Sequence, residues 1–171
     1  MSSRQDAITW SVPGYRLRQG SDLDHLKLLD CMQCAYRELG ATRFDQLEAT
    51  VRQTLSEATQ LWWVESDDAP ARPRVGFVNA VPGSVGCLWL GSAIDQSTGQ
   101  RQAYVFLVYI APEHRRRGLG TALMQYGQSW AQRQGYQQVG LQVFERNQSA
   151  LNLYQKLGYQ PQAIWMVKEL N

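Results

Sequence analysis

The chain has 171 residues and 44% of them are hydrophobic, which is enough for one domain with a sizeable core. Its formal net charge of +2 argues against a large nucleic-acid-binding surface. No stretch approaches the roughly 18 consecutive apolar residues of a membrane span, and the first residues lack the apolar core of a secretory signal, so we expect a cytoplasmic protein without membrane contacts.

The N-terminal third predicts one strand and two helices. Residues 1–13 are polar and end at Pro13, so we expect an N-terminal leader followed by a single domain over residues 14–171. Residues 15–18 alternate as a short strand. The run Ser21-Asp-Leu-Asp24 resembles a capping box that opens a helix ending at Gly40.

Both helices carry apolar residues at helical spacing. The inner face of the first helix is expected to include Leu23, Leu26 and Leu29. The second helix is expected over residues 45–58. Its apolar stripe consists of Leu47, Val51, Leu55 and Ala58.

The middle of the chain predicts the main sheet. Residues 61–65 and 74–81 are expected to form an antiparallel hairpin, and residues 85–94 are a glycine-interrupted apolar segment before a turn at residues 97–100. Residues 104–110 are apolar throughout, which is typical of a central strand buried on both faces. A helix ending near Gly135, a parallel strand over residues 139–144, a short helix over residues 149–157 and a last strand over residues 163–170 complete the order.

The most informative stretch joins the central strand to the helix that follows it. The strand breaks at Pro112, and the helix restarts after a basic turn, Arg115-Arg-Arg-Gly-Leu-Gly120. The first backbone N–H groups of a helix have no intrahelical partners, so such a turn favours an anion. Glycines permit close approach of a phosphate, and guanidinium groups match its oxygens, which indicates a pyrophosphate ligand. Taken alone, the same residues also fit a solvated arginine run and a plain loop.

Two motifs together resemble a known family. The turn is similar to the (Arg/Gln)-x-x-Gly-x-(Gly/Ala) signature of the GNAT superfamily of N-acetyltransferases, and Asn147-x-x-Ala150-x-x-x-Tyr154 followed by Leu-Gly-Tyr159 is similar to a second pattern of that family. The motifs cover residues 104–159, and the N-terminal third matches only in the order of its elements. The resemblance implies an α/β fold with one domain and a mixed central sheet of six to seven strands flanked by helices.

The resemblance also implies where acetyl-CoA, the co-substrate of this family, is bound. The backbone of the central strand would pair with the pantetheine arm, and the turn and helix start would bind the pyrophosphate; no metal is implied. The implied cofactor-binding residues are Val108, Tyr109, Ile110, Arg115, Arg116, Arg117, Gly118, Leu119, Gly120, Thr121, Asn147 and Tyr154.

Two of these residues have alternative explanations from the sequence alone. Asn147 fits a helix cap better than a cofactor ligand, and Tyr154 fits core packing. In the family, the tyrosine that matches Tyr154 protonates the departing thiolate of coenzyme A, so the resemblance implies a catalytic general acid at this position.

The general base is not identified by the sequence. The positions where family members carry a carboxylate fall here in residues 102–104 and at Gln142. Glu113 and His114 are ionisable neighbours of the turn, and water relayed through Tyr104 or Tyr109 is an equal alternative.

Cysteines and tryptophans are expected to serve packing. Cys31-x-x-Cys34 lies within a helix without a second ligand pair, and three cysteines form no disulfide framework, which fits a reducing compartment. Trp62, Trp63 and Trp89 either belong to the core or line an acceptor pocket.

The sequence therefore predicts an N-acetyltransferase that moves an acetyl group from acetyl-CoA to a primary amine of a small molecule, peptide or protein, by direct transfer in a ternary complex. The alternatives are a non-catalytic acyl-CoA-binding or sensor protein of the same fold, and a nucleotide-binding regulator. The sequence does not determine the oligomeric state; a homodimer is one possible assembly, since dimers are common among proteins that resemble this one.

Overall fold

The computed structural model describes residues 10–56, 58–68 and 84–170. Two single 3-10 turns, Asp22–Asp24 and Pro112–His114, precede helices. The strands and helices, in chain order, are β1 (Tyr15–Gln19), α1 (His25–Glu38), α2 (Asp45–Thr54), β2 (Gln60–Ser66), β3 (Ser84–Ile94), β4 (Arg101–Ile110), α3 (Leu119–Arg133), β5 (Val139–Leu141) and α4 (Gln148–Lys156).

The strands form one mixed sheet in the order β1-β2-β3-β4-β5. Successive strands from β1 to β4 pair antiparallel. β5 pairs parallel with β4, as expected for two strands joined through a helix. A tight turn connects β3 to β4, because Asp95 Oδ1 accepts hydrogen bonds from the backbone of Ser97 (2.7 Å) and Thr98 (3.0 Å). The resulting α/β domain has the predicted class, with five strands in the described residues instead of six to seven.

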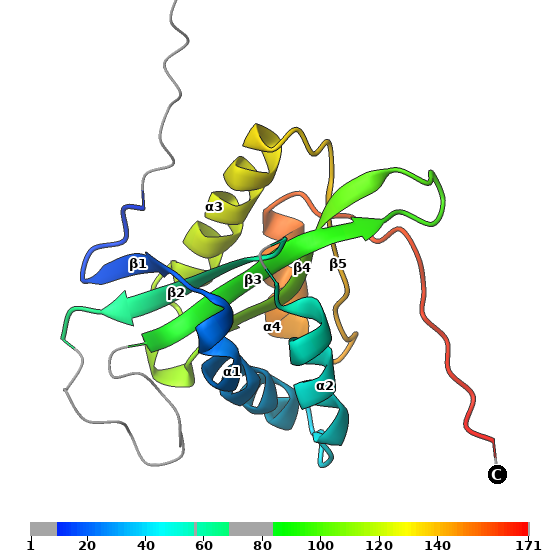
Figure 1. The fold of residues 1–171 in the computed structure, drawn as a ribbon, viewed down its shortest axis with the longest axis horizontal. Coiled ribbons are helices and arrows are strands. Elements are labelled where there is room, and N and C mark those ends of the chain that lie inside the picture. Colours follow the sequence, from blue (N-terminus) through cyan, green and yellow to red (C-terminus); the bar gives the residue numbers. More distant parts are fainter. Residues whose placement is uncertain (1–9, 57, 69–83, 171) are drawn as a thin grey trace, which may run out of the picture.

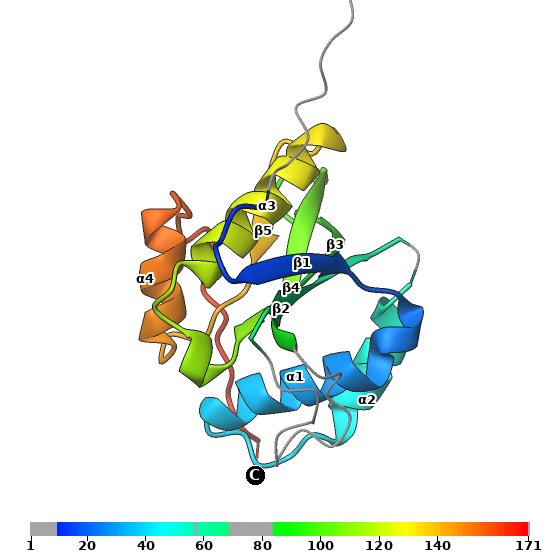
Figure 2. The ribbon, with the colours of Figure 1, turned by 90° about the vertical axis from the view of Figure 1, so that its left-hand side faces the viewer.

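The helices cover the two faces of the sheet. α1 and α2 lie on one face, and α3 and α4 lie on the other (Figures 1 and 2). Each face has its own apolar cluster, because side chains alternate along a strand. The α3-side cluster includes Trp62, Leu88, Leu123, Met124 and Tyr154, and the α1-side cluster includes Leu28, Val51, Trp63, Trp89 and Leu107.

A β-bulge in β4 changes which residues face each cluster. Trp89 pairs with Leu107 and Leu90 pairs with Val105, so Phe106 is an extra residue in β4. Val105 belongs to the α3-side cluster, whereas Phe106 and Leu107 both pack on the α1 side. The bulge therefore gives the second half of β4 a reversed alternation.

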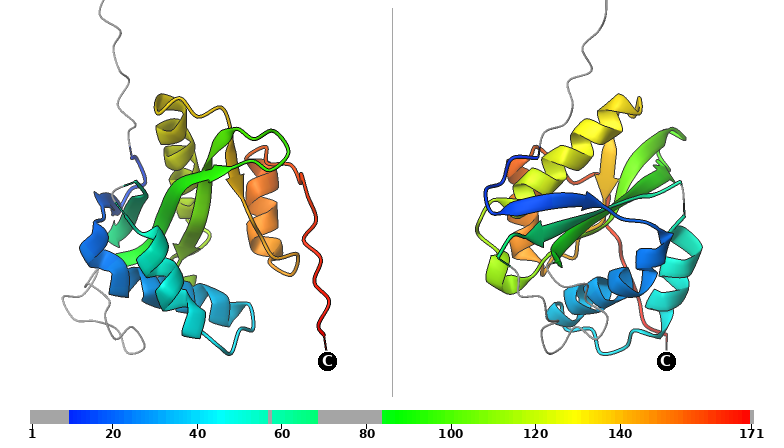
Figure 3. Two further views of the ribbon diagram at one scale, coloured as in Figure 1. Left: turned by 45° about the vertical axis from the view of Figure 1, so that its right-hand side comes forward. Right: turned by 60° about the vertical axis from the view of Figure 1, so that its left-hand side comes forward.

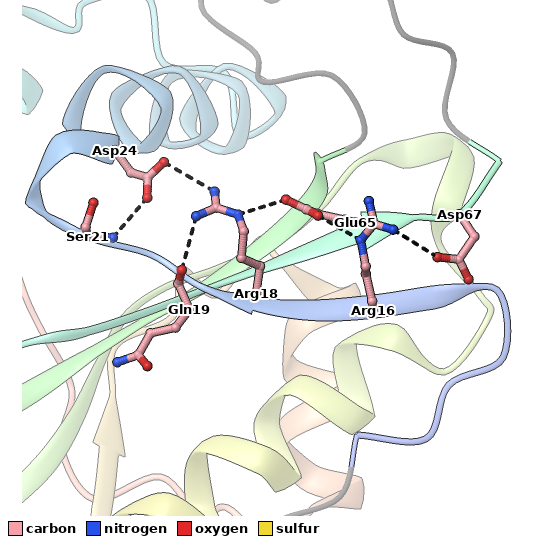
Figure 4. A network of polar contacts seen from close by, with 7 residues as sticks. All are labelled: Arg16, Arg18, Gln19, Ser21, Asp24, Glu65 and Asp67. Atoms are coloured by element: carbon pink, nitrogen blue, oxygen red, sulfur yellow. Dashed lines mark hydrogen bonds and ion pairs between the residues drawn. The ribbon is translucent and has the colours of Figure 1, made fainter.

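A polar network joins β1, β2 and the start of α1 (Figure 4). Arg16 Nε and Arg18 Nε donate to the two carboxylate oxygens of Glu65 at 3.0 and 2.8 Å. Arg18 also contacts Asp24 Oδ1 at 3.4 Å, and the backbone N–H of Ser21 donates to Asp24 Oδ2 at 2.9 Å. Burial alone would raise the pKa of the Glu65 carboxyl. The hydrogen bonds donated by the two arginines have a larger effect in the opposite direction, so the pKa lies below its ordinary value.

Lys27 is buried beside this network. Its Nζ lies 3.7 Å from the centre of the Trp63 ring and has no hydrogen-bond partner in the described part of the chain. Burial, followed by the nearby charge of Arg18, lowers the pKa of the ammonium from 10.5 to about 8. The cation is therefore held mainly by the face of an indole ring.

The structure corrects the predicted inner face of the first helix. Leu23 and Leu26 are 85% and 45% exposed, and the buried residues of α1 are Lys27, Leu28, Cys31 and Met32. The reason is the 3-10 turn at Asp22–Asp24, which delays the start of α1 to His25 and shifts the buried stripe. α2 ends at Thr54, so the predicted stripe loses Ala58, which is exposed, while Val51 is buried.

The predicted last strand is also wrong, since residues 163–170 form no strand. Five of their apolar side chains are exposed, and the segment runs away from α4 (Figure 3). A β-prone sequence becomes a strand only where another strand pairs with it, and the structure records no such pairing for this segment. β5 ends at Leu141, three residues short of its predicted end. The expected strand over residues 74–81 lies outside the described residues; β2 pairs with β1 and β3.

Candidate functional site

The candidate site begins where β4 ends and α3 begins. Gly118 caps α3 with a left-handed backbone (φ +81°), and the first intrahelical bond runs from Ala122 N–H to the Gly118 carbonyl at 2.9 Å. Residues 115–118 are exposed, and a Cβ added at Gly118 would meet no atom within 4 Å. The turn is therefore open to solvent directly before the helix start, whose first N–H groups have no intrahelical partners, as an anion site requires.

Gly120 has a second, structural reason to be glycine. A Cβ at this position would lie 3.3 Å from Leu153 Cδ2 of α4. The first turn of α3 thus packs closely on α4, which brings the two sequence motifs together.

The three arginines of the turn have different surroundings. Arg115 Nε donates to the Ile110 carbonyl at 2.7 Å, and its Nη2 contacts both carboxylate oxygens of Glu38 at 2.8 and 2.7 Å. Arg117 donates to the Tyr15 hydroxyl at 2.9 Å. Arg116 is exposed and has a positive φ of 64°, the only non-glycine with one in the described residues. Arg115 and Arg117 therefore brace the turn, and Arg116 is left to the solvent side.

Among the residues that the structure describes, no strand pairs with the edge of β4 beyond the bulge on the β5 side. Pairing with β5 joins only residues 103–105 to 139–141. The Ala111 N–H donates to the Val85 carbonyl at 2.8 Å, so the polar backbone groups of Ala111 face β3. By alternation, those of Tyr109 also face β3, and those of Val108 and Ile110 face the open edge. Because Arg115 occupies the Ile110 carbonyl, Val108 carries the backbone groups that a ligand could pair with.

Asn147 caps α4, as its residue type predicted. Its Oδ1 accepts a hydrogen bond from the Ala150 N–H at 3.2 Å, and its carbonyl accepts from Leu151 N–H at 3.0 Å. The side-chain NH₂ group takes no part in the cap. Its role toward a cofactor stays a prediction.

Tyr154 lies on α4 with its ring in the α3-side cluster. The side chain is 8% exposed, and the Tyr159 ring centre is 5.7 Å away. Burial, with a smaller contribution from Tyr159, raises the pKa of Tyr154 to about 12. Within the described residues, the Tyr154 hydroxyl is not a fully buried group that lacks a hydrogen-bond partner. Tyr154 is therefore a packed phenol that stays protonated at neutral pH.

Of the two ionisable residues considered as a general base, His114 contacts Tyr15 through its ring, and Glu113 contacts Arg117 through its backbone carbonyl. His114 Nδ1 and the Tyr15 hydroxyl share a hydrogen bond of 2.9 Å, and the Glu113 carbonyl accepts from Arg117 at 3.3 Å. Gln142 is exposed at the end of β5. Sequence analysis missed the contacts of Tyr15 and Glu38 with the turn, because each residue lies about 80 to 100 residues from the turn along the chain.

Tryptophans and cysteines lie in the core. Trp63 and Trp89 are fully buried on the α1 side, and Trp62 packs against Tyr126 and Trp130 on the other face. Cys31 and Cys34 pack in the α1-side cluster, which confirms their predicted role. Within the described ranges, no group of three His, Cys, Asp or Glu residues could hold a metal ion, and no helix is long and apolar enough to cross a membrane.

Comparison with known proteins agrees with this arrangement. The model of the acetyltransferase (GNAT) family matches residues 27–159. Human N-acetyltransferase 8 is 30% identical over 105 residues, which cover 61% of this chain and 40% of that protein. The peptidyl-lysine N-acetyltransferase YiaC of Escherichia coli is 39% identical over 56 residues, covering 33% and 35%. The chain thus spans less than half the length of each relative.

The fold has a close structural counterpart. A putative acetyl transferase from Pyrococcus furiosus superposes with a TM-score of 0.69 at 19% identity, over 91% of this chain and 99% of that chain. At this identity the likeness concerns the fold alone. The family match includes β4, which has the open strand edge, and the basic turn, which leads into the start of α3. It also includes α4. The chain therefore belongs to the acetyltransferase (GNAT) family.

Proposed function

We propose that this chain transfers an acetyl group from acetyl-CoA to a primary amine, by direct attack in a ternary complex. One observation carries the proposal: the unpaired edge at Val108 and the exposed start of α3 lie at the two ends of one short connection, residues 111–118. A ligand with an amide-containing arm and a pyrophosphate would satisfy both groups at once.

The residues present fit acetyl-CoA. The N–H groups at the start of α3, with Gly118 open above them, would hold the pyrophosphate, and exposed Arg116 would add charge. The Val108 backbone would pair with the pantetheine amides. Bound there, acetyl-CoA supplies a thioester whose carbonyl carbon a neutral amine can attack.

Tyr154 is the proposed general acid. Its phenol lies on α4, which packs against the first turn of α3 through Leu153 and Gly120. With a pKa of about 12, it holds its proton at neutral pH and can donate it to a departing thiolate. No described residue competes for the hydroxyl through a hydrogen bond.

Direct transfer is favoured over a covalent acyl-enzyme by the state of the cysteines. Cys31 and Cys87 are buried on the α1 side, and a hydrogen bond that the protonated Cys87 thiol shares with Cys31, together with burial, raises the pKa of Cys87. Burial also raises the pKa of Cys34. A nucleophile must be a thiolate, so these thiols are poorly suited to the role. Because they are all free, we also place the protein in a reducing compartment such as the cytoplasm.

The test is release of free coenzyme A. Purified full-length chain is mixed with acetyl-CoA and a panel of small amines, an amino acid and a lysine peptide, and the free thiol is measured. The proposal expects amine-dependent thiol release with at least one class. If coenzyme A binds but no amine is acetylated, the chain is a non-catalytic acyl-CoA-binding protein. This alternative is favoured by residues 102–104 and Gln142, which carry no carboxylate where the resemblance places one.

A further inference from the structure

Four partly exposed aromatic side chains lie around the place where β4 and β5 separate. Tyr36 comes from α1, Tyr104 and Phe106 from β4, and Phe144 from the segment after β5. Phe144 is 48% exposed and the others are half-buried. We call these four rings the aromatic surface.

The rings are connected in two pairs. Tyr104 and Phe106 meet edge to face with centres 5.3 Å apart, and Phe106 rests on buried Trp89 at 4.8 Å. Tyr36 and Phe144 also meet edge to face, at 6.1 Å. Tyr36 and Phe106 both pack against the α1-side cluster, which places the two pairs on the same face of the sheet. An edge-to-face contact occupies one face of only one ring in the pair, so the remaining faces and edges can contact a further aromatic group.

Backbone features hold two of the rings in place. The β-bulge directs Phe106 to the α1 side, and a Cβ at Gly91 of β3 would lie 2.6 Å from Phe106 Cε2. Tyr104 pairs with Gly91 on one side and with Gly140 of β5 on the other. Neighbouring strands therefore put no side chain of their own beside Tyr104 at these two positions.

The aromatic surface lies next to the proposed thioester end of the cofactor. Phe106 is two residues from Val108, whose backbone edge is proposed to bind the pantetheine arm, and it faces α1, whereas Val108 packs toward α3. An amine that approaches from the α1 side would meet these rings first.

Charge near this surface disfavours acceptors with several ammonium groups. The Arg146 guanidinium lies 5.0 Å from the centre of the Phe144 ring. Glu38, at the end of α1, is engaged by Arg115 at 2.7 and 2.8 Å. A polycation needs free carboxylates, whereas a single ammonium is compatible with aromatic ring faces.

We infer that the acceptor is a monoamine attached to an aromatic group, whose ring packs against Tyr36, Tyr104, Phe106 and Phe144. The inference rests on the proposed function and names its acceptor class. It assigns these residues to acceptor specificity and not to the chemical step.

The first test is binding, which does not depend on turnover. Phenethylamine and butylamine are titrated calorimetrically into the full chain saturated with coenzyme A, with spermidine as the polycation. We expect phenethylamine to bind at least about tenfold more tightly than the other two. Phe144→Ala should remove most of this preference, and Ile94→Ala, which shortens another exposed apolar side chain (59% exposed) at the last position of β3, opposite Arg101, should keep it.

Turnover then separates the two proposals. Equal binding of butylamine or spermidine, or an unchanged preference in Phe144→Ala, would overturn the aromatic assignment. Acetylation of aliphatic amines as efficiently as aromatic ones would do the same and leave the proposed function standing. Selective binding of phenethylamine without acetylation of any amine would refute the proposed function and leave the aromatic surface as a binding site.

Discussion

Replacing Tyr154 by phenylalanine is a clean test of the proposed general acid. The ring is 8% exposed in the α3-side cluster, and phenylalanine keeps its volume and its contact with Tyr159. No described residue forms a hydrogen bond with the hydroxyl, so its removal leaves no buried partner unsatisfied. We therefore expect the free energy of unfolding to change by less than about 0.5 kcal/mol.

The expected kinetic effect of Tyr154→Phe is much larger. A positioned general acid contributes about 10²-fold to 10⁴-fold to rate, so kcat for acetyl transfer should fall at least about 100-fold while the affinity for acetyl-CoA changes little. Free-thiol release measures kcat, and calorimetry measures binding. Wild-type turnover in a folded Tyr154→Phe protein would refute the acid role and leave core packing as the explanation of this residue.

Three further substitutions test the energetics of the fold by urea unfolding. Lys27→Met should raise the free energy of unfolding at pH 7 by about 2 kcal/mol, because it removes a buried charge. This gain should shrink between pH 8 and 10.5, where lysine is neutral in the folded state but still charged in the unfolded state. A gain that stays constant over this range would contradict the lowered pKa. Glu65→Gln should cost about 2 kcal/mol at pH 7 and progressively less below pH 4.5, as the wild-type carboxyl is protonated and its stabilising charge is lost; a pH-independent cost would exclude the ionic contribution. Gly118→Ala should cost about 1 kcal/mol because φ is +81°, and should weaken coenzyme A binding; unchanged binding would remove Gly118 from the phosphate site.

Local chemistry explains which parts of the fold could be predicted. The turn from Arg115 to Gly120, the Asn147 cap and the order from β3 to α4 depend on residues close in sequence, and the structure has them near the expected positions. Glycine backbones and capping side chains act within a few residues.

The remaining features depend on contacts between distant residues. The bulge at Phe106 is a property of the register between β3 and β4, and the Arg115–Glu38 contact needs the end of α1 to reach the turn. The 3-10 turn that moved the buried face of α1 away from Leu23 also has no clear sequence signal. Residues 163–170 have the composition of a strand, but composition does not provide a pairing partner.

Thermal unfolding with cofactors tests the central proposal most directly. A ligand present at about one hundred times its dissociation constant adds about 2.7 kcal/mol of stability, which for a chain of this size raises the midpoint by about 5 to 10 °C. We predict this shift with acetyl-CoA and with coenzyme A, and none with ATP or NAD at the same concentration. No shift with either coenzyme A compound, or an equal shift with ATP, would contradict the assignment of the Val108 edge and the start of α3 as an acetyl-CoA site.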